Sequence, residues 1–244
     1  MPDTREHRGP HPADAELFAP AALPPLREAV ADFCLLLTKG YAEKSALKLV
    51  GDRFSLTQRQ RLAVMRSSCS DRQLQSRLAR CLSLEALAGQ PIAIDGYNLL
   101  ITIEAALSGG LIFQGRDGCF RDLASIHGTY HRVEETVPAV TLIGEFLTEI
   151  RVASALWLLD SPVSNSGRLK TLIGRLAQER NRPWEIRLTI SPDAELSRMD
   201  TIVVSTDSVV LDACTRWANV AAELIIRELQ ETTVIDLGLA SHSS

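Results

Sequence analysis

The sequence predicts an α/β domain built on a mainly parallel sheet, preceded by a small domain made only of helices. Residues 19–90 repeat apolar side chains at helical spacing. After Pro91 short apolar segments alternate with helical ones, and strands joined by crossover helices pair in parallel. The 244 residues are 45% hydrophobic and 23% charged, so the chain has enough apolar side chains to bury a core.

The N-terminal part divides into a tail and a helical domain. Residues 1–18 mix Pro, His, Arg and Asp without an apolar core, so we expect a disordered tail and no signal peptide. In the helical domain, residues 19–90, Ser55–Leu56–Thr57 offers an N-cap and Gly89–Gln90–Pro91 marks the end. The predicted helices cover residues 26–38, 42–50, 58–66 and 70–87.

Residues 91–244 form the predicted α/β domain. Gly115–Arg116–Asp117–Gly118, inside an insert over residues 111–131, is typical of a hairpin turn. The predicted strands cover residues 92–94, 156–159, 184–190, 201–205 and 233–237. The predicted helices cover residues 98–107, one or two segments within 121–152, a segment that ends at Arg180, and residues 207–231.

Charge is divided unevenly between the two domains. Residues 19–90 carry 11 basic and 6 acidic side chains, a net charge of +5, whereas residues 91–244 carry 13 and 20, a net charge of −7. The basic part could attract phosphate while the acidic part collects a cation. The alternative is that the two parts simply attract each other.

Cysteine usage and hydropathy indicate the compartment. The five cysteines are scattered without metal-ligand spacing, which favours free thiols in a reducing cytoplasm. No apolar stretch approaches the length of a bilayer span. We therefore expect a cytoplasmic protein without a membrane partner.

Three of the predicted strands are followed by an aspartate within two residues: Asp95, Asp160 and Asp207. Because the carboxyl ends of parallel strands lie along one edge of a sheet, these side chains can converge there. Carboxylates are the ligands that Mg²⁺ and Mn²⁺ prefer, and such an ion activates water and neutralises charge on a phosphate. Any one of them alone is more often a turn former or helix cap. The coincidence of three favours a metal site.

Other residues are candidates around this site. Glu104 lies among apolar residues on the first helix of the α/β domain and is a candidate fourth ligand, with an exposed surface glutamate as the alternative. Free N–H groups and two cations begin the helix after Asp160, an arrangement that suits a phosphate but equally describes an ordinary cap. The candidate substrate-binding residues are Asn98, Ser161, Asn165, Ser166, Arg168, Lys170 and, in the insert, Arg121.

The helical domain contains a dense run of arginines that could contact nucleic-acid phosphates. A solvated helix face gives the same pattern, and few aromatic residues lie between these arginines for base stacking. The run consists of Arg59, Arg61, Arg66, Arg72, Arg77 and Arg80.

Two motifs resemble those of a known nuclease superfamily. Ile94–Asp95–Gly96–Tyr97–Asn98 resembles the opening of PIN and NYN-like nuclease domains, where a strand runs into an Asp–Gly–x–Asn motif. Ser205–Thr206–Asp207–Ser208, followed by Asp212, resembles their late acidic motif. Over about residues 19–237 the chain is similar to an uncharacterised bacterial and archaeal family that joins a helical domain of unknown function to a PIN-like half.

This resemblance implies a three-layer α/β/α PIN-like fold and a ribonuclease-like hydrolase dependent on Mg²⁺ or Mn²⁺. Its metal ligands would be Asp95, Asp160 and Asp207, with Glu104 as the acid carried on a helix. The insert over residues 111–131 is longer than a minimal PIN domain contains.

The sequence thus favours a metal-dependent nuclease that acts on RNA rather than DNA, and it leaves a homo-oligomer open. One alternative is a nucleic-acid-binding protein that kept the fold and lost catalysis. The other is a small-molecule phosphate hydrolase. Against this second alternative, the first strand of the α/β domain lacks an Asp-x-Asp motif, and no glycine-rich phosphate loop is present.

Overall fold

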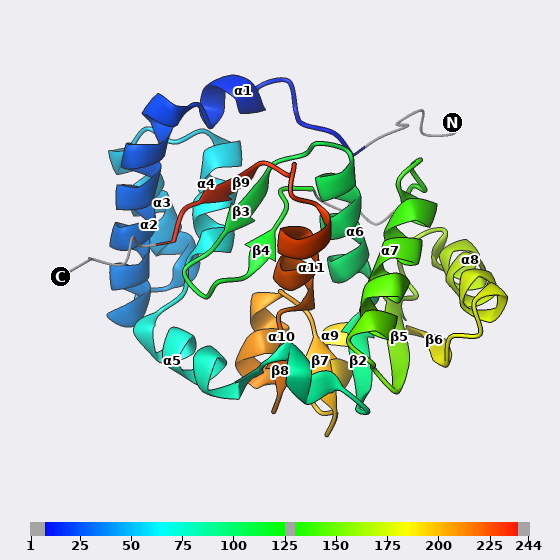
Figure 1. The fold of residues 1–244 in the computed structure, drawn as a ribbon. Coiled ribbons are helices and arrows are strands. Elements are labelled where there is room, and N and C mark those ends of the chain that lie inside the picture. Colours follow the sequence, from blue (N-terminus) through cyan, green and yellow to red (C-terminus); the bar gives the residue numbers. More distant parts are fainter. Residues whose placement is uncertain (1–7, 125–129, 239–244) are drawn as a thin grey trace.

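The computed structural model describes residues 8–124 and 130–238. It confirms an α/β fold in which helices flank a mostly parallel six-stranded sheet, with a helical region at the N-terminal side (Figure 1). Within the described residues, no helix is long and apolar enough to cross a membrane.

The helical region contains α2 (Leu23–Thr38), α3 (Glu43–Arg53), α4 (Gln58–Ser67) and α5 (Asp71–Arg80). A short 3₁₀ turn, η1 (Pro20–Ala22), precedes them. Thr57 and Ser70 begin α4 and α5 with capping boxes, in which each hydroxyl and the glutamine three residues later satisfy each other's backbone N–H groups.

The fourth predicted helix is too long. It ends at Arg80 and is followed by β1 (Cys81–Leu82) and the 3₁₀ turn η2 (Leu84–Leu87). The physical reason is a strand partner distant in sequence, because β1 pairs in parallel with Trp217 and Ala218.

Residues 8–18, predicted to be part of a disordered tail, instead contact both the helical region and the α/β part. They include α1 (Asp14–Leu17), where the buried Asp14 carboxylate accepts a hydrogen bond from Arg59 Nη2 at 2.8 Å. The ring of Phe18 packs edge-on against Phe113, with 4.8 Å between centroids. This part of the prediction is wrong because the residues that hold the segment in place, Arg59 and Phe113, are distant from it in the sequence. Residues 1–7 lie outside the described residues.

The main sheet has the strand order β1-β8-β7-β2-β5-β6, and every pairing in it is parallel. Its β2 pairs with both β5 and β7, so these three strands are neighbours. The strands after β1 are β2 (Pro91–Asp95), β5 (Ser154–Asp160), β6 (Trp184–Thr189), β7 (Ile202–Val204) and β8 (Trp217–Ala218).

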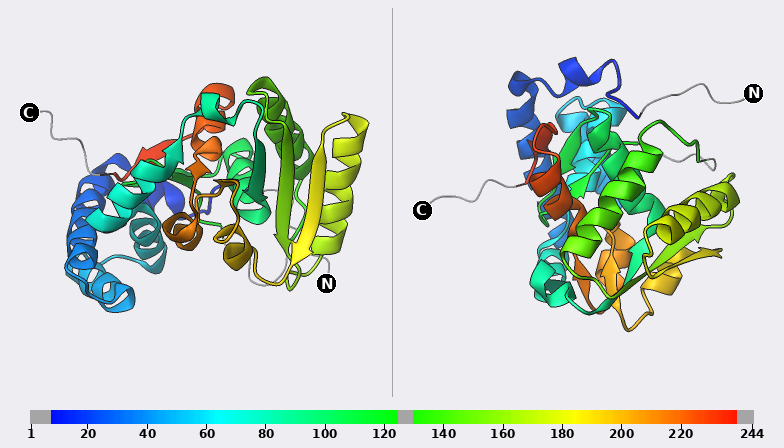
Figure 2. Two further views of the ribbon diagram at one scale, coloured as in Figure 1. Left: turned by 90° about the horizontal axis from the view of Figure 1, so that it is seen from below. Right: turned by 45° about the vertical axis from the view of Figure 1, so that its right-hand side comes forward.

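Side chains that alternate along the strands build a core on each face of this sheet. Ile94 and Trp157 belong to one hydrophobic cluster with residues of four helices, whereas Ala93 and Leu158 belong to another with residues of two shorter helices. The first face carries α6 (Gly96–Leu107), α7 (Thr136–Glu149), α8 (Ser166–Glu179) and α11 (Val220–Glu228) (Figure 2). The second face carries α9 (Pro192–Leu196) and α10 (Ser208–Ala213).

The long helix predicted over residues 207–231 is interrupted. It is divided into α10, the strand β8 and α11, because its apolar residues serve opposite faces of the sheet. Trp217 in β8 is buried, and its indole N–H donates to the carbonyl oxygen of Arg77 at 2.9 Å.

The insert forms the predicted hairpin. β3 (Ile112–Gln114) and β4 (Phe120–Arg121) pair antiparallel, and Gly118 in their turn has a φ of 74°, a conformation that favours glycine. The last predicted strand, β9 (Val234–Asp236), pairs with β3, so these three form a second small sheet. This sheet shares a hydrophobic cluster with α2 and α4, so the helical region and the α/β part pack as neighbours.

Candidate functional site

The three predicted aspartates lie at the same edge of the main sheet. Asp95 is the last residue of β2 and Asp160 the last residue of β5, while Asp207 begins α10 three residues after β7. Because β2 lies between the other two strands and all three are parallel, their carboxyl ends are adjacent.

Asp95 is the most buried of the three, with 6% of its surface exposed. Burial, together with the negative charges of Asp193 and Asp207, raises its pKa to about 7 against a hydrogen bond from Ser205. Ser205 Oγ donates to Asp95 Oδ2 at 2.8 Å, and the N–H of Asn98 donates to Oδ1 at 3.4 Å.

Asp193, in α9 after β6, belongs to the same edge but is absent from the sequence-based candidates. Partial desolvation raises its pKa, and Asp207 raises it further. The pKa of Asp160 is raised by partial desolvation and then by Asp193. The sequence does contain a signal for Asp193, which is a fourth acid after a predicted strand, but Ser191 and Pro192 separate it from the strand end.

We call Asp95, Asp160, Asp193 and Asp207 the aspartate edge. Within the described residues none of the four forms an ion pair with a cation. In the same part of the chain, no group of three His, Cys, Asp or Glu side chains is arranged to hold a metal ion by itself. The edge is therefore a concentration of uncompensated negative charge and not a preformed cage.

Two polar residues fix the loop that carries Asp207. Asn98 Oδ1 accepts hydrogen bonds from the N–H of Thr206 at 2.8 Å and from its hydroxyl at 3.0 Å. Ser205 Oγ accepts one from the N–H of Asp207 at 3.0 Å while it donates to Asp95. Asn98 and Ser205 thus hold Asp95 and Asp207 in fixed relation. Ser205 was not predicted as a site residue.

Glu104 does not lie on the aspartate edge. It is eight residues beyond the first residue of α6, which is about 12 Å along the helix axis. Its fully buried carboxylate pairs with Arg8 and accepts hydrogen bonds from the hydroxyls of Tyr130 and Thr136. Burial raises the pKa of Glu104, and Arg8 opposes this. This position does not support Glu104 as a fourth metal ligand. Its pairing with Arg8, 96 residues away in the sequence, explains why an acid is buried among apolar neighbours.

The substitution Glu104→Gln tests this reassignment. It leaves the half-buried Arg8 without its counter-charge, so we expect urea unfolding to give a lower free energy of unfolding, by about 1 to 3 kcal/mol. The shift in unfolding midpoint on adding Mn²⁺ stays as in the wild type. Unchanged stability together with a lost Mn²⁺ effect would return Glu104 to the metal site.

Arg121, predicted to contact phosphate, is instead buried and paired inside the protein. Its Nη1 and Nη2 donate to the two carboxylate oxygens of Asp117 at 2.9 and 2.7 Å, and its Nε donates to the Thr206 carbonyl at 2.7 Å. Arg77 donates to Asp117 at 2.6 Å and to Asp212 at 2.7 Å. We call these four charged residues the Arg–Asp cluster.

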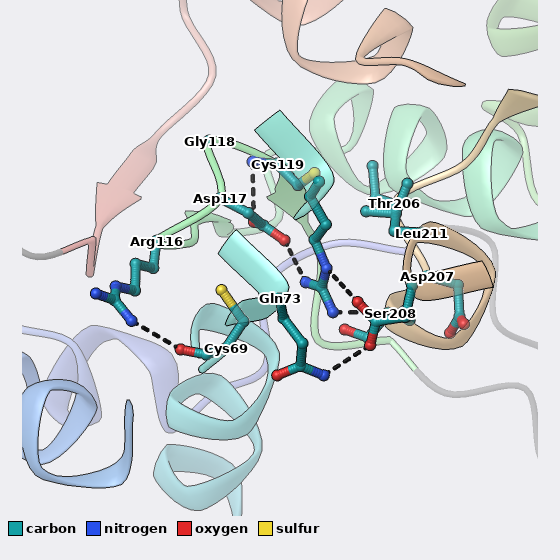
Figure 3. Close-up of polar contacts among 12 residues, drawn as sticks. Cys69, Gln73, Arg116, Asp117, Gly118, Cys119, Thr206, Asp207, Ser208 and Leu211 are labelled. Atoms are coloured by element: carbon teal, nitrogen blue, oxygen red, sulfur yellow. Dashed lines mark hydrogen bonds and ion pairs between the residues drawn. The ribbon is translucent and has the colours of Figure 1, made fainter. Parts of the chain in front are cut away.

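The Arg–Asp cluster joins three elements distant in the sequence. Figure 3 shows Asp117 and Cys119 of the hairpin near Gln73 of α5 and Ser208 of α10, and Gln73 donates to Asp212 at 2.6 Å. Here opposite charges of the helical region and the α/β part attract each other. This is the alternative explanation given above for the uneven division of charge.

Most of the arginine run is likewise occupied within the protein. Arg59 pairs with Asp14 and Arg61 with Asp52, while Arg66 and Arg80 donate to backbone carbonyls. Of the run, Arg72 alone is exposed without a partner among the described residues. The run therefore ties the protein together more than it offers free cations.

The start of α8 retains the predicted free cations. Arg168 and Lys170 are exposed and have no partner among the described residues. Asn165 precedes the helix with a φ of 70°, and its side-chain amide donates to the Tyr130 carbonyl at 3.1 Å. Ser166 is buried, with its hydroxyl 3.5 Å from the carbonyl oxygen of the exposed Ser161.

A cleft of about 650 Å³ lies between the helical region and the sheet edge. Asn98, Thr206 and Asp207 line one side of it, and helices α2, α4 and α5 line the other. Because Asp207 belongs to the aspartate edge, the cleft and the edge adjoin.

Comparison with known proteins agrees with the two regions. Residues 25–80 match a family described as a protein of unknown function (DUF434), and residues 84–223 match one described as a domain of unknown function (DUF5616). "Uncharacterized protein MJ0935" of Methanocaldococcus jannaschii is 29% identical over 186 residues, which cover 76% of this chain and 88% of that protein. No solved structure matches. Because the second match spans more than half of the chain, the chain belongs to the DUF5616 family.

Proposed function

We propose that the chain is a PIN-like phosphodiesterase that uses Mg²⁺ or Mn²⁺ to cleave RNA. One observation carries the proposal: four aspartates from neighbouring strand ends lie at one edge without any cation partner among the described residues. Asp95 is the buried member of the four, and the buried acids Asp14, Asp117 and Glu104, by contrast, each pair with an arginine. Unpaired acids brought together are costly unless a ligand compensates them.

The aspartate edge fits a hydrated divalent cation better than a fully caged one. Mg²⁺ keeps several waters and commonly takes one or two protein carboxylates together with substrate phosphates. A site without three converging protein ligands meets that description. Asp95 and Asp207 would hold the ion, with Asp193 and Asp160 beside them. When bound, it would supply activation of water and neutralisation of charge on the phosphate.

The protein's own groups would do the remaining work. Asn98 and Ser205 hold Asp95 and Asp207 in position through the hydrogen bonds described above. Arg168 and Lys170 offer free positive charge on the helix that follows Asp160, where they could bind a substrate phosphate. Phosphates attracted there would lie beside the aspartates.

Asp95→Asn tests the activity. With labelled single-stranded RNA and Mn²⁺ or Mg²⁺, we expect the wild type to cleave and the variant to be slower on the order of 100-fold or more, because it loses a charge at the reacting centre. Asp200→Asn is the matched control, because Asp200 has a side chain that is 96% exposed. Cleavage that persists in EDTA, or equal rates for both variants, would contradict the proposal. Binding without cleavage would favour an inactive binding protein, and turnover of phosphomonoesters alone a small-molecule hydrolase.

A further inference from the structure

The cleft beside the aspartate edge has properties that the proposed cleavage does not use. Its volume of about 650 Å³ lies within the range of small-molecule sites. We infer that it binds an unpaired nucleobase, with the helical region as one of its two walls. The inference rests on the proposed function only for the class of substrate, nucleic acid.

Apolar side chains lie on both walls of the cleft, among polar ones. Phe33, Leu37 and Met65 line it from the helical region, and Ile101 and Val209 line it from the α/β part. Val209 is 64% exposed, which is unusual for a side chain of its type. Apolar side chains on opposite walls, with polar groups around them, suit a flat, weakly polar group that inserts between the walls.

The charges of the cleft argue against a phosphate. Phosphate backbones are attracted by uncompensated cations. Arg77 and Arg121 are paired in the Arg–Asp cluster, and Arg66 donates to the Ala124 carbonyl at 3.1 Å and lies 3.5 Å from Asp122. Asp207 and the exposed Glu43 add negative charge to the lining. A neutral group therefore fits the cleft better than an anion.

Unused polar atoms in the lining complete the argument. Among the described residues, the side-chain amide nitrogen of Asn98, Oδ2 of Asp207 and the hydroxyl of Ser208 have no hydrogen-bond partner. Tyr97 also lines the cleft, and its buried hydroxyl is unpartnered in the described part of the chain. Buried polar groups normally have partners. Together these donors and acceptors match the edge of a base.

Binding of two RNAs tests the inference without any cleavage. We would measure fluorescence anisotropy in EDTA with a short single-stranded RNA and with the same RNA lacking its bases. We expect the intact RNA to bind about 10-fold more tightly, since stacking one base is worth about that much. In Val209→Asp, which places a charge on the apolar part of the wall while the backbone N–H still caps Asp207, this difference disappears; repulsion by the new charge affects both RNAs alike.

Ile226→Asp is the matched control, because Ile226 is also an exposed apolar residue, 56% exposed, on α11 outside the cleft lining. It should keep the 10-fold difference. Equal affinity of the wild type for both RNAs, no binding of either, or a difference that survives in Val209→Asp would each overturn the inference. Because the assay needs neither metal nor cleavage, base-dependent binding with no nuclease activity would leave the cleft assignment standing and remove the proposed function alone.

Discussion

Replacing Asp117 with alanine lowers the free energy of unfolding by about 3 to 5 kcal/mol, the cost of breaking a buried ion pair from one side. Asp117 is 5% exposed and bonds the guanidinium groups of both Arg77 and Arg121, which are themselves buried. Burial opposes ionisation of Asp117, yet the two arginines hold its pKa well below its usual range. Without Asp117, Arg121 keeps only carbonyl partners.

The measurement is urea unfolding followed by circular dichroism. Asp52→Ala is the matched control, because Asp52 also pairs with two cations, Lys48 and Arg61, but lies on the surface. Surface ion pairs are screened by water and contribute little, so this variant should unfold close to the wild type. Similar losses in the two variants would mean that burial is not what makes the Arg–Asp cluster important.

The Arg–Asp cluster also shows what the sequence could not reveal. Arg77 and Asp212 are 135 residues apart, and Arg8 and Glu104 are 96 apart. No local pattern indicates which acid an arginine will meet after folding. A run of arginines therefore has the same sequence signature whether it faces solvent or binds carboxylates and carbonyls in the interior.

The aspartate edge was predictable because its signal is local. A buried strand that ends in an acid is visible in a few residues, and parallel strands place such acids at one edge. Asp193 was not predicted because two residues separate it from the predicted strand, although its helix places it at the same edge. The break between α10 and α11 was not predicted because apolar residues that pack on two faces of a sheet can have the same spacing as those of one long helix.

Asp95→Asn should stabilise the protein in EDTA at about pH 8, which is the reverse of the usual effect of a core substitution. The folded pKa of Asp95, about 7, is raised above its ordinary value of 3.8, chiefly by burial. The folded protein therefore binds more protons than the unfolded chain between these values, and stability falls as pH rises through that window. Above it the penalty is on the order of 4 kcal/mol, which a neutral asparagine avoids.

A divalent cation should narrow this difference. A ligand present at 100 times its dissociation constant stabilises the folded state by about 2.7 kcal/mol, and we expect Mn²⁺ to do so for the wild type but not for Asp95→Asn. Asp200→Asn should follow the wild type in both media. If Asp95→Asn is instead the less stable protein in EDTA, the Asp95 carboxylate contributes to the fold. In that case burial of the Asp95 carboxylate does not destabilise the protein, and its lack of a cation partner is no longer a reason to expect a metal ion.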